Sequence, residues 1–137
     1  MDNLSKVLLI KILATVLIWC IPLLFFPESV FIWIGFPSSI ISTTLLFYRL
    51  LAWAYIALCV GYTFALIESI KGKRLISTIW TGIVSNGGAC IILLIYGCIG
   101  TWANWGLLAQ IILWGSIVVT GLITLGLYSF GIRGYNS

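Results

Sequence analysis

The sequence predicts an all-α integral membrane protein, a bundle of four transmembrane helices with both termini on the cytoplasmic side. Hydrophobic residues make up 62% of the 137 residues and charged residues only 7%, whereas globular domains carry about 25% charged residues. Mean hydropathy is +1.21, and the apolar residues form four runs close to the roughly 20 residues that cross a bilayer. Lysines and arginines flank these runs mainly on one side, which predicts the orientation.

The first predicted span covers about residues 7–26. The chain continues with PES and not with a small-residue cleavage site, which favours a retained span over a signal peptide. Lys11 lies just inside this run and is expected to snorkel back to the interface where the span begins. An outer linker over residues 27–44 follows. Its apolar middle, residues 30–36, is too short to cross and is expected to lie on the outer membrane surface.

Three further spans are predicted over about residues 45–67, 75–99 and 105–130. Their apolar residues are continuous and do not alternate with polar ones, as the strands of a membrane barrel would. We therefore expect a single four-helix transmembrane domain over residues 1–137.

The orientation follows from the basic residues. The linkers 27–44 and 100–104 contain no lysine or arginine, and if each run crosses the membrane, six of the seven basic residues fall on the side of the N-terminus. These six are Lys6, Lys11, Lys71, Lys73, Arg74 and Arg133. The positive-inside rule then predicts that both termini are cytoplasmic. The basic residues form no stripe on a polar surface, which excludes nucleic acid as a partner and leaves the lipid bilayer as the expected surrounding.

Few residues suggest catalysis. The chain has no histidine, which removes the commonest general base and all histidine-containing metal sites, and its three acids do not form a pair in the sequence. The four cysteines contain no C-x-x-C pair and are interpreted as small buried hydrophobic residues; they are Cys20, Cys59, Cys90 and Cys98. The sequence therefore favours a role without catalysis, and it predicts no metal site.

Tyr48, Tyr55 and Tyr62 recur at intervals of seven in the second span, so their phenol rings share one helix face. In one interpretation they fill the bundle or form hydrogen bonds across it. In the other they line a pocket for an aromatic or quinone-like molecule. The sequence favours the first interpretation but leaves both open.

Small residues indicate helix packing in the second and third spans. Ala57, Gly61 and Ala65 are spaced by four, which allows a neighbouring helix to approach closely. In the third span Gly87 and Gly88 are also candidate packing positions.

Asn86 precedes these two glycines near mid-membrane. Its amide needs a partner in hydrocarbon. The favoured hypothesis is that Asn86 forms a hydrogen bond to a neighbouring helix. The alternative is a helix broken at Gly87–Gly88, whose free carbonyls line a substrate or ion site.

Arg49 is the most unusual residue, because a charge within a span is costly and functional by default. It lies about four residues inside the second predicted span and can extend toward the outer surface. One hypothesis is snorkelling or an ion pair with Glu28, the only acid of the outer linker. The other is an anion or cofactor pocket in which Arg49 acts with Tyr48, Tyr55 and Asn86.

The order of several motifs resembles the DoxX-like group of small bacterial four-helix membrane proteins. The similar features are Pro22 and Pro27 near the end of the first span, Phe47–Leu51, Gly61–Tyr62 and the basic turn Lys71–Arg74, all within roughly the first half of the chain. Some members of that group are similar to subunits that link membrane thiol or sulfur oxidation to quinone. The resemblance therefore implies the bacterial cytoplasmic (inner) membrane as the location and quinone as a candidate cofactor.

Three functions remain open from the sequence. The favoured one is an accessory or structural subunit of a membrane complex, with other membrane subunits or further copies of the chain as partners. The second is a quinone-binding or small-molecule-binding redox component of the DoxX-like type. The third is a small oligomeric transporter or channel.

Overall fold

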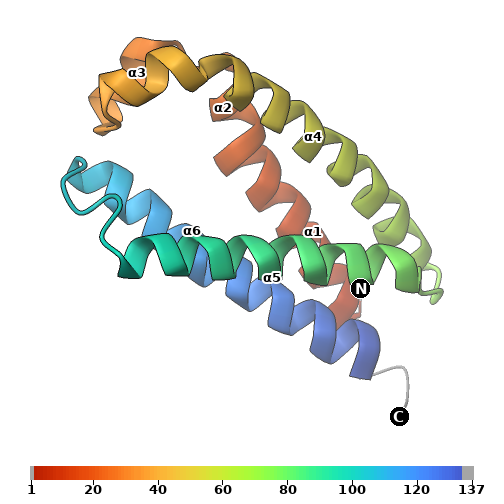
Figure 1. The fold of residues 1–137 in the computed structure, drawn as a ribbon. Coiled ribbons are helices and arrows are strands. Elements are labelled where there is room, and N and C mark those ends of the chain that lie inside the picture. The colour runs from red at the N-terminus through yellow and green to blue at the C-terminus, as the bar shows by residue number, and fades with distance from the viewer. Residues whose placement is uncertain (1, 134–137) are drawn as a thin grey trace.

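The computed structural model describes residues 2–133, with the exception of the side chains of Ser42 and Thr43, and this range contains helices and no strands (Figure 1). Four helical segments are long and apolar enough to cross a membrane, namely Asn3–Phe25, Thr44–Ile70, Ile76–Cys98 and Leu107–Ile132. The predicted all-α fold with four candidate spans is confirmed.

The first span begins at Asn3, four residues before the predicted start at residue 7, because its first turn is polar and hydropathy alone does not include it. Helix α1 (Asn3–Ala14) is capped by Asp2, whose carboxylate accepts a hydrogen bond of 2.8 Å from the Ser5 amide. The Ser69 hydroxyl donates to the same carboxylate oxygen at 3.3 Å. These bonds, first those from Ser5, hold the pKa of Asp2 below its usual value.

Beyond α1 the first span changes its helical geometry. The π-helix η1 (Thr15–Cys20) precedes α2 (Ile21–Phe25), and the Ile21 amide donates to the Val16 carbonyl five residues earlier. Pro22 lies in the first turn of α2 and has no N–H to donate. A wider turn at this point is a usual way for a helix to accommodate such a residue.

The segment predicted as an outer linker is largely helical. It contains α3 (Glu28–Ile34) and the first turns of α4 (Ser38–Ile70), and the two helices are joined through Gly35 with φ of +107°. At 33 residues, α4 is about 50 Å long, longer than the roughly 30 Å hydrocarbon layer. Figure 1 shows it running obliquely to the third and fourth spans, which begin at Ile76 and Leu107.

Helices α5 (Ile76–Cys98) and α6 (Leu107–Gly126) form a close antiparallel pair, and α6 continues into the π-helix η2 (Leu127–Ile132). This pair meets α3 at two glycines, because the Gly106 amide donates to the Gly35 carbonyl at 2.9 Å. A Cβ atom added at Gly35 would lie 2.5 Å from the Gly106 Cα. The contact therefore depends on both residues lacking a side chain.

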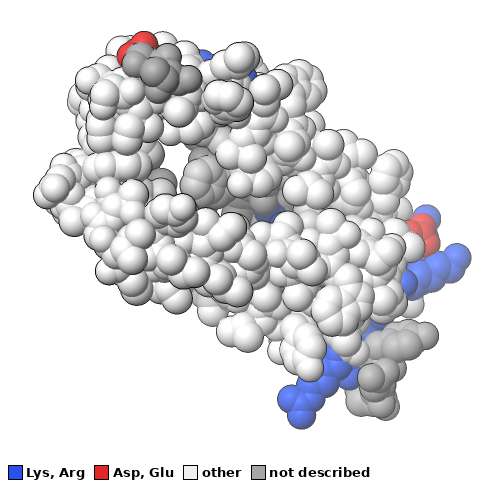
Figure 2. All heavy atoms as spheres, in the orientation of Figure 1, with Lys and Arg blue, Asp and Glu red and all other residues white. Residues whose placement is uncertain are grey.

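The two ends of the bundle differ in charge. The N-terminus, the turn between α4 and α5 and the end of η2 lie together at one end, which we call the terminal end; the opposite end carries α3 and is called the α3 end (Figure 1). Figure 2 shows blue basic atoms concentrated at the terminal end. The charge separation expected from the sequence is therefore present.

Packing is concentrated at the two ends. A cluster of buried side chains from all four spans closes the terminal end; its members are Leu4, Leu8, Tyr62, Ala65, Ile79, Ile123 and Leu127. At the α3 end, separate clusters form around Phe31 and around Trp102. From the terminal end toward the α3 end, α4 diverges from α5 (Figure 1).

Candidate functional site

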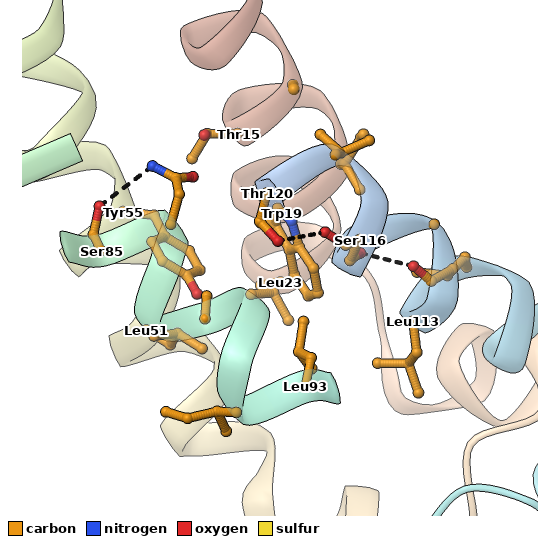
Figure 3. A pocket seen from close by; sticks show the side chains of 18 of the residues that line it. Thr15, Trp19, Leu23, Leu51, Tyr55, Ser85, Leu93, Leu113, Ser116 and Thr120 are labelled. Carbon is orange, nitrogen blue, oxygen red and sulfur yellow. Dashed lines mark hydrogen bonds between the residues drawn. The ribbon is translucent and has the colours of Figure 1, made fainter. Parts of the chain in front are cut away.

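The middle of the bundle contains a cavity of about 810 Å³, within the range of small-molecule sites. Figure 2 shows the molecule hollowed on the face between α4 and α5. Side chains from all four spans face this space in Figure 3, among them Thr15, Trp19, Tyr55, Ser85, Leu93, Leu113, Ser116 and Thr120. The cavity is therefore built by the whole bundle and not by one helix pair.

The three tyrosines of α4 all line the cavity. Tyr48, Tyr55 and Tyr62 come from one face of the helix, as their spacing predicts. Tyr62 is the most buried, and its hydroxyl lies 3.1 Å from that of Ser85 on α5. This bond joins α4 to α5 near the point where the two helices diverge.

Lys11 lies at the terminal end of the cavity, and the structure contradicts the predicted snorkelling. Its side chain is only 3% exposed, and its Nζ lies 4.1 Å from the centre of the Tyr62 ring. It is the one lysine or arginine among the described residues that line the cavity. Figure 2 shows basic atoms at the bottom of the hollow.

Lys11 is incompletely compensated within the described part of the chain. A lysine at the centre of a transmembrane helix costs about 2.5–3.5 kcal/mol on insertion scales, whereas a desolvated cation–π contact contributes about 2 kcal/mol. Among residues 2–133 its ammonium forms no ion pair, although it carries three N–H donors. A deficit of about 1 kcal/mol therefore remains at a group that faces the cavity.

The burial of Lys11 follows from the sequence once its helix face is considered together with its depth. Leu4, Leu8, Lys11 and Thr15 follow the three- and four-residue spacing of one helix face, and the first three are buried while Thr15 lines the cavity. Lys11 thus belongs to the inward stripe of α1, where a side chain cannot return to the interface.

Asn86 also lines the cavity, but among the described residues it does not form the predicted bond to another helix. Its amide nitrogen donates to the Gly82 carbonyl of its own helix at 2.7 Å and contacts the Ser85 hydroxyl at 3.4 Å. Helix α5 continues unbroken through Gly87 and Gly88, so the broken-helix alternative is wrong. Asn86 therefore uses its amide nitrogen within α5.

Two hydroxyl side chains of α6 complete the polar part of the wall. Ser116 and Thr120 line the cavity, and each donates at 2.7 Å to the carbonyl four residues earlier in its own helix. This pattern is the one expected for Ser and Thr in membrane helices. These two donors are therefore satisfied within α6, and Lys11 is the charged group of the cavity wall.

Arg49 has hydrogen-bond partners that neither sequence hypothesis named. Its guanidinium donates to the main-chain carbonyls of Leu23 at 2.5 Å and Phe26 at 2.6 Å. Arg49 does not line the cavity, and among the described residues it forms no ion pair with Glu28. The predicted Arg49–Glu28 pair is therefore wrong, and Arg49 is not brought together with Tyr48, Tyr55 and Asn86.

The end of α2 explains why Arg49 binds these two carbonyls. Helix α2 ends at Phe25, and Pro27 supplies no N–H that could reach the carbonyl of Leu23, four residues earlier. The last carbonyls of a helix need other donors, above all in a membrane. Arg49 provides them from the neighbouring helix and acts as a C-terminal cap of α2.

The small residues predicted for helix packing are used only in part. Ala65 is buried in the core, whereas Ala57 is exposed and a Cβ atom added at Gly61 would meet nothing within 4 Å. A Cβ atom at Gly87 would lie 3.4 Å from Thr124, and one at Gly88 would meet nothing within 4 Å. Of the five positions predicted for helix packing, only Ala65 and Gly87 are thus in close contact with a neighbouring helix in the described chain.

Cys20 and Cys59 form a pair that the sequence did not suggest. Both are free and buried, one in η1 and one in α4, and the two thiols lie close enough to influence each other electrostatically. No C-x-x-C spacing indicates such a pair, because the two residues come from different spans. The described part of the chain contains no group of three His, Cys, Asp or Glu residues that could hold a metal ion.

Aromatic rings cover the α3 end of the cavity. Phe36 and Trp105 lie with ring centroids 5.3 Å apart, and Trp102 contacts both Trp105 and Trp114. The indole N–H of Trp102 is buried without an acceptor among the described residues. The cavity thus has a basic end at Lys11 and an aromatic end at Trp102 and Trp105.

No protein-family model, curated protein or solved structure matches this chain at a significant level.

Proposed function

We propose that this protein binds a small, largely apolar molecule that enters its cavity from the surrounding bilayer. The observation that carries the proposal is the 810 Å³ cavity in the middle of four apolar helices, lined by side chains from each of them. A site of this size with apolar walls and a few polar groups is typical of small-molecule binding.

The direction of entry follows from the divergence of the helices. The cavity is hollowed on the face between α4 and α5 (Figure 2), and this face belongs to the apolar part of two candidate spans. A molecule dissolved in hydrocarbon would reach it without crossing a polar surface. Quinone, the cofactor implied by the DoxX-like resemblance, is one candidate of this kind.

Photolabelling in lipid nanodiscs tests the proposal. A long-chain alcohol carrying a diazirine should label cavity residues such as Tyr55 and Asn86 in a saturable manner. Labelling of outward residues such as Val84 and Leu122, which are 69% and 64% exposed, should rise in proportion to probe concentration. An excess of unlabelled ubiquinone tests the quinone candidate by competition.

Two variants make the test specific. Gly115 lines the cavity and a Cβ atom there would meet nothing within 4 Å, so Gly115→Phe should fill the cavity and abolish saturable labelling. Gly61 has the same free space but does not line the cavity, so Gly61→Phe is the matched control. Equal labelling of cavity and outward residues in the unmodified protein would overturn the proposal.

A subunit role is the second candidate function. Ala57 is exposed and the Cβ position of Gly61 is open, so this part of the small-residue ridge is available to a helix of another chain. Purification in mild detergent followed by identification of co-purifying polypeptides tests it. A monomer that retains no polypeptide would count against this role.

We also propose that the terminal end faces the cytoplasm and that the membrane is the bacterial cytoplasmic one. The concentration of Lys and Arg at that end supports the orientation (Figure 2), and the resemblance supports the location. Labelling of a cysteine placed near either terminus with a membrane-impermeant maleimide, in intact and in opened cells, tests the orientation.

A further inference from the structure

We propose that the ligand is a single-chain amphiphile with a carboxylate head group, and that Lys11 binds this head group as its counter-ion. The inference rests on the proposed binding function and adds the chemistry of the ligand. It starts from a cation that lines the cavity although its side chain is only 3% exposed.

No carboxylate side chain of this protein forms an ion pair with Lys11 in the described structure. The sequence contains three acids, and each is used elsewhere or lies far along the chain. Asp2 accepts hydrogen bonds at the start of α1, Glu68 pairs with Lys71 at 2.9 Å, and Glu28 begins α3 at the opposite end. The described chain therefore leaves Lys11 without a negative partner, which a ligand can supply.

The surroundings of Lys11 fit a small acceptor group. The Tyr62 ring lies on one side of the ammonium at 4.1 Å, and Thr15 lines the cavity one helical turn further along the same face of the first span. Beyond this point the cavity is walled by side chains such as Leu93 and Leu113 and ends at Trp102. This arrangement provides a charged end for the head group of a ligand and an apolar path for a single hydrocarbon tail.

The depth of Lys11 restricts the head group. Lys11 is eight residues beyond Asn3, the first residue of α1, which corresponds to roughly 12 Å along the helix. A phospholipid head group remains at the membrane surface, whereas a carboxylate is small enough to reach this depth beside its chain. The single positive charge of Lys11 also matches the single negative charge of a carboxylate. A neutral quinone carbonyl would leave the positive charge of Lys11 uncompensated.

Energy transfer from tryptophan to a polyene fatty acid measures this preference. Trp19, Trp102 and Trp105 line the cavity, so cis-parinaric acid bound there accepts their excitation. The assay uses the full chain in nanodiscs of zwitterionic lipid and records the saturable part of the transfer. We expect the acid to bind at least tenfold more tightly than cis-parinaryl alcohol, and unlabelled palmitate to displace it.

Charge-neutralising variants assign the preference to one residue. Lys11→Met keeps an unbranched, flexible side chain without the ammonium, and it should remove the preference for the acid while the alcohol still binds. Lys6 is exposed on the same helix and outside the cavity, so Lys6→Met makes the same charge change and should retain the preference. A preference that survives in Lys11→Met would overturn the assignment.

The comparison of acid and alcohol in the unmodified protein needs no variant, so the proposal stays testable if Lys11→Met does not fold. Equal affinities for acid and alcohol, with saturable diazirine labelling of the cavity, would refute the carboxylate and leave the binding function standing. Absence of saturable labelling by the diazirine alcohol, together with absence of acid binding, would refute both.

Discussion

Replacing Arg49 with methionine should destabilise the bundle without affecting ligand binding. The guanidinium makes two hydrogen bonds to main-chain carbonyls of the first span, and a hydrogen bond to a charged group contributes about 1.5–3 kcal/mol. Two such bonds would give about 3–6 kcal/mol if they were fully buried. Arg49 is half-buried, so water and lipid head groups replace part of the loss, and we expect about 2–3 kcal/mol.

Unfolding in mixed micelles of increasing sodium dodecyl sulfate, followed by circular dichroism, measures this free energy. Arg49→Lys should lie between the native protein and Arg49→Met, because one ammonium cannot serve both carbonyls in the way the forked guanidinium does. Arg133 is exposed near the end of the chain, so Arg133→Met is the matched control. A cost for Arg49→Met within about 0.5 kcal/mol of that control, which is the spread of ordinary surface substitutions, would refute the cap.

Three further predictions concern other parts of the fold. Gly35→Ala should lower the free energy of unfolding by about 3 kcal/mol, because it adds a steric conflict with Gly106 to the left-handed backbone strain. Gly72→Ala, at φ of +77° in open space, should cost only about 1–2 kcal/mol in the same unfolding titration; equal costs would show that the glycine contact is unimportant. In the absence of ligand, Lys11→Met should stabilise the protein by about 1 kcal/mol, because it removes a buried cation that only the Tyr62 ring compensates; a loss of stability would mean that the ammonium has a further partner in the fold. The lowered pKa of Asp2 makes its contribution to stability full above the unfolded-state pKa, and this contribution is lost as pH falls through the folded-state pKa. Asp2→Asn should therefore flatten the fall in melting temperature as pH decreases below about 5, and an unchanged slope would contradict the role of this cap.

The helices were predictable because hydropathy over a whole span depends on many residues at once. The ends of α5, at Ile76 and Cys98, differ from the predicted 75 and 99 by one residue. The start of α1 was missed because its polar first turn is held by Asp2 and not by hydrophobic residues. The helices within the predicted linker were missed for a related reason. Helix α3 and the first turns of α4 are too short to cross a membrane, so a search for spans does not detect them.

The positions of candidate site residues were predictable only where they depend on the geometry of a single helix. The shared face of Tyr48, Tyr55 and Tyr62 follows from their spacing, and all three line the cavity. The partners of Arg49 are carbonyls of another span, and main-chain acceptors leave no mark in a sequence. Lys11 was misjudged because its depth was considered without its helix face.

The π-helix η1 has a consequence for how the first span should be studied. Before it, the inward residues include Leu4, Leu8 and Lys11, which cluster on an ideal helical wheel; after it, the buried residues are Cys20 and Leu23. At 100° per residue, the second group is rotated by about 120° from these three residues, close to the 100° that one extra residue in a wide turn requires. A mutational scan of this span should therefore show two periodic series of sensitive positions with a phase shift between Thr15 and Cys20, and one wheel drawn for the whole span would assign lipid-facing positions wrongly in its second half.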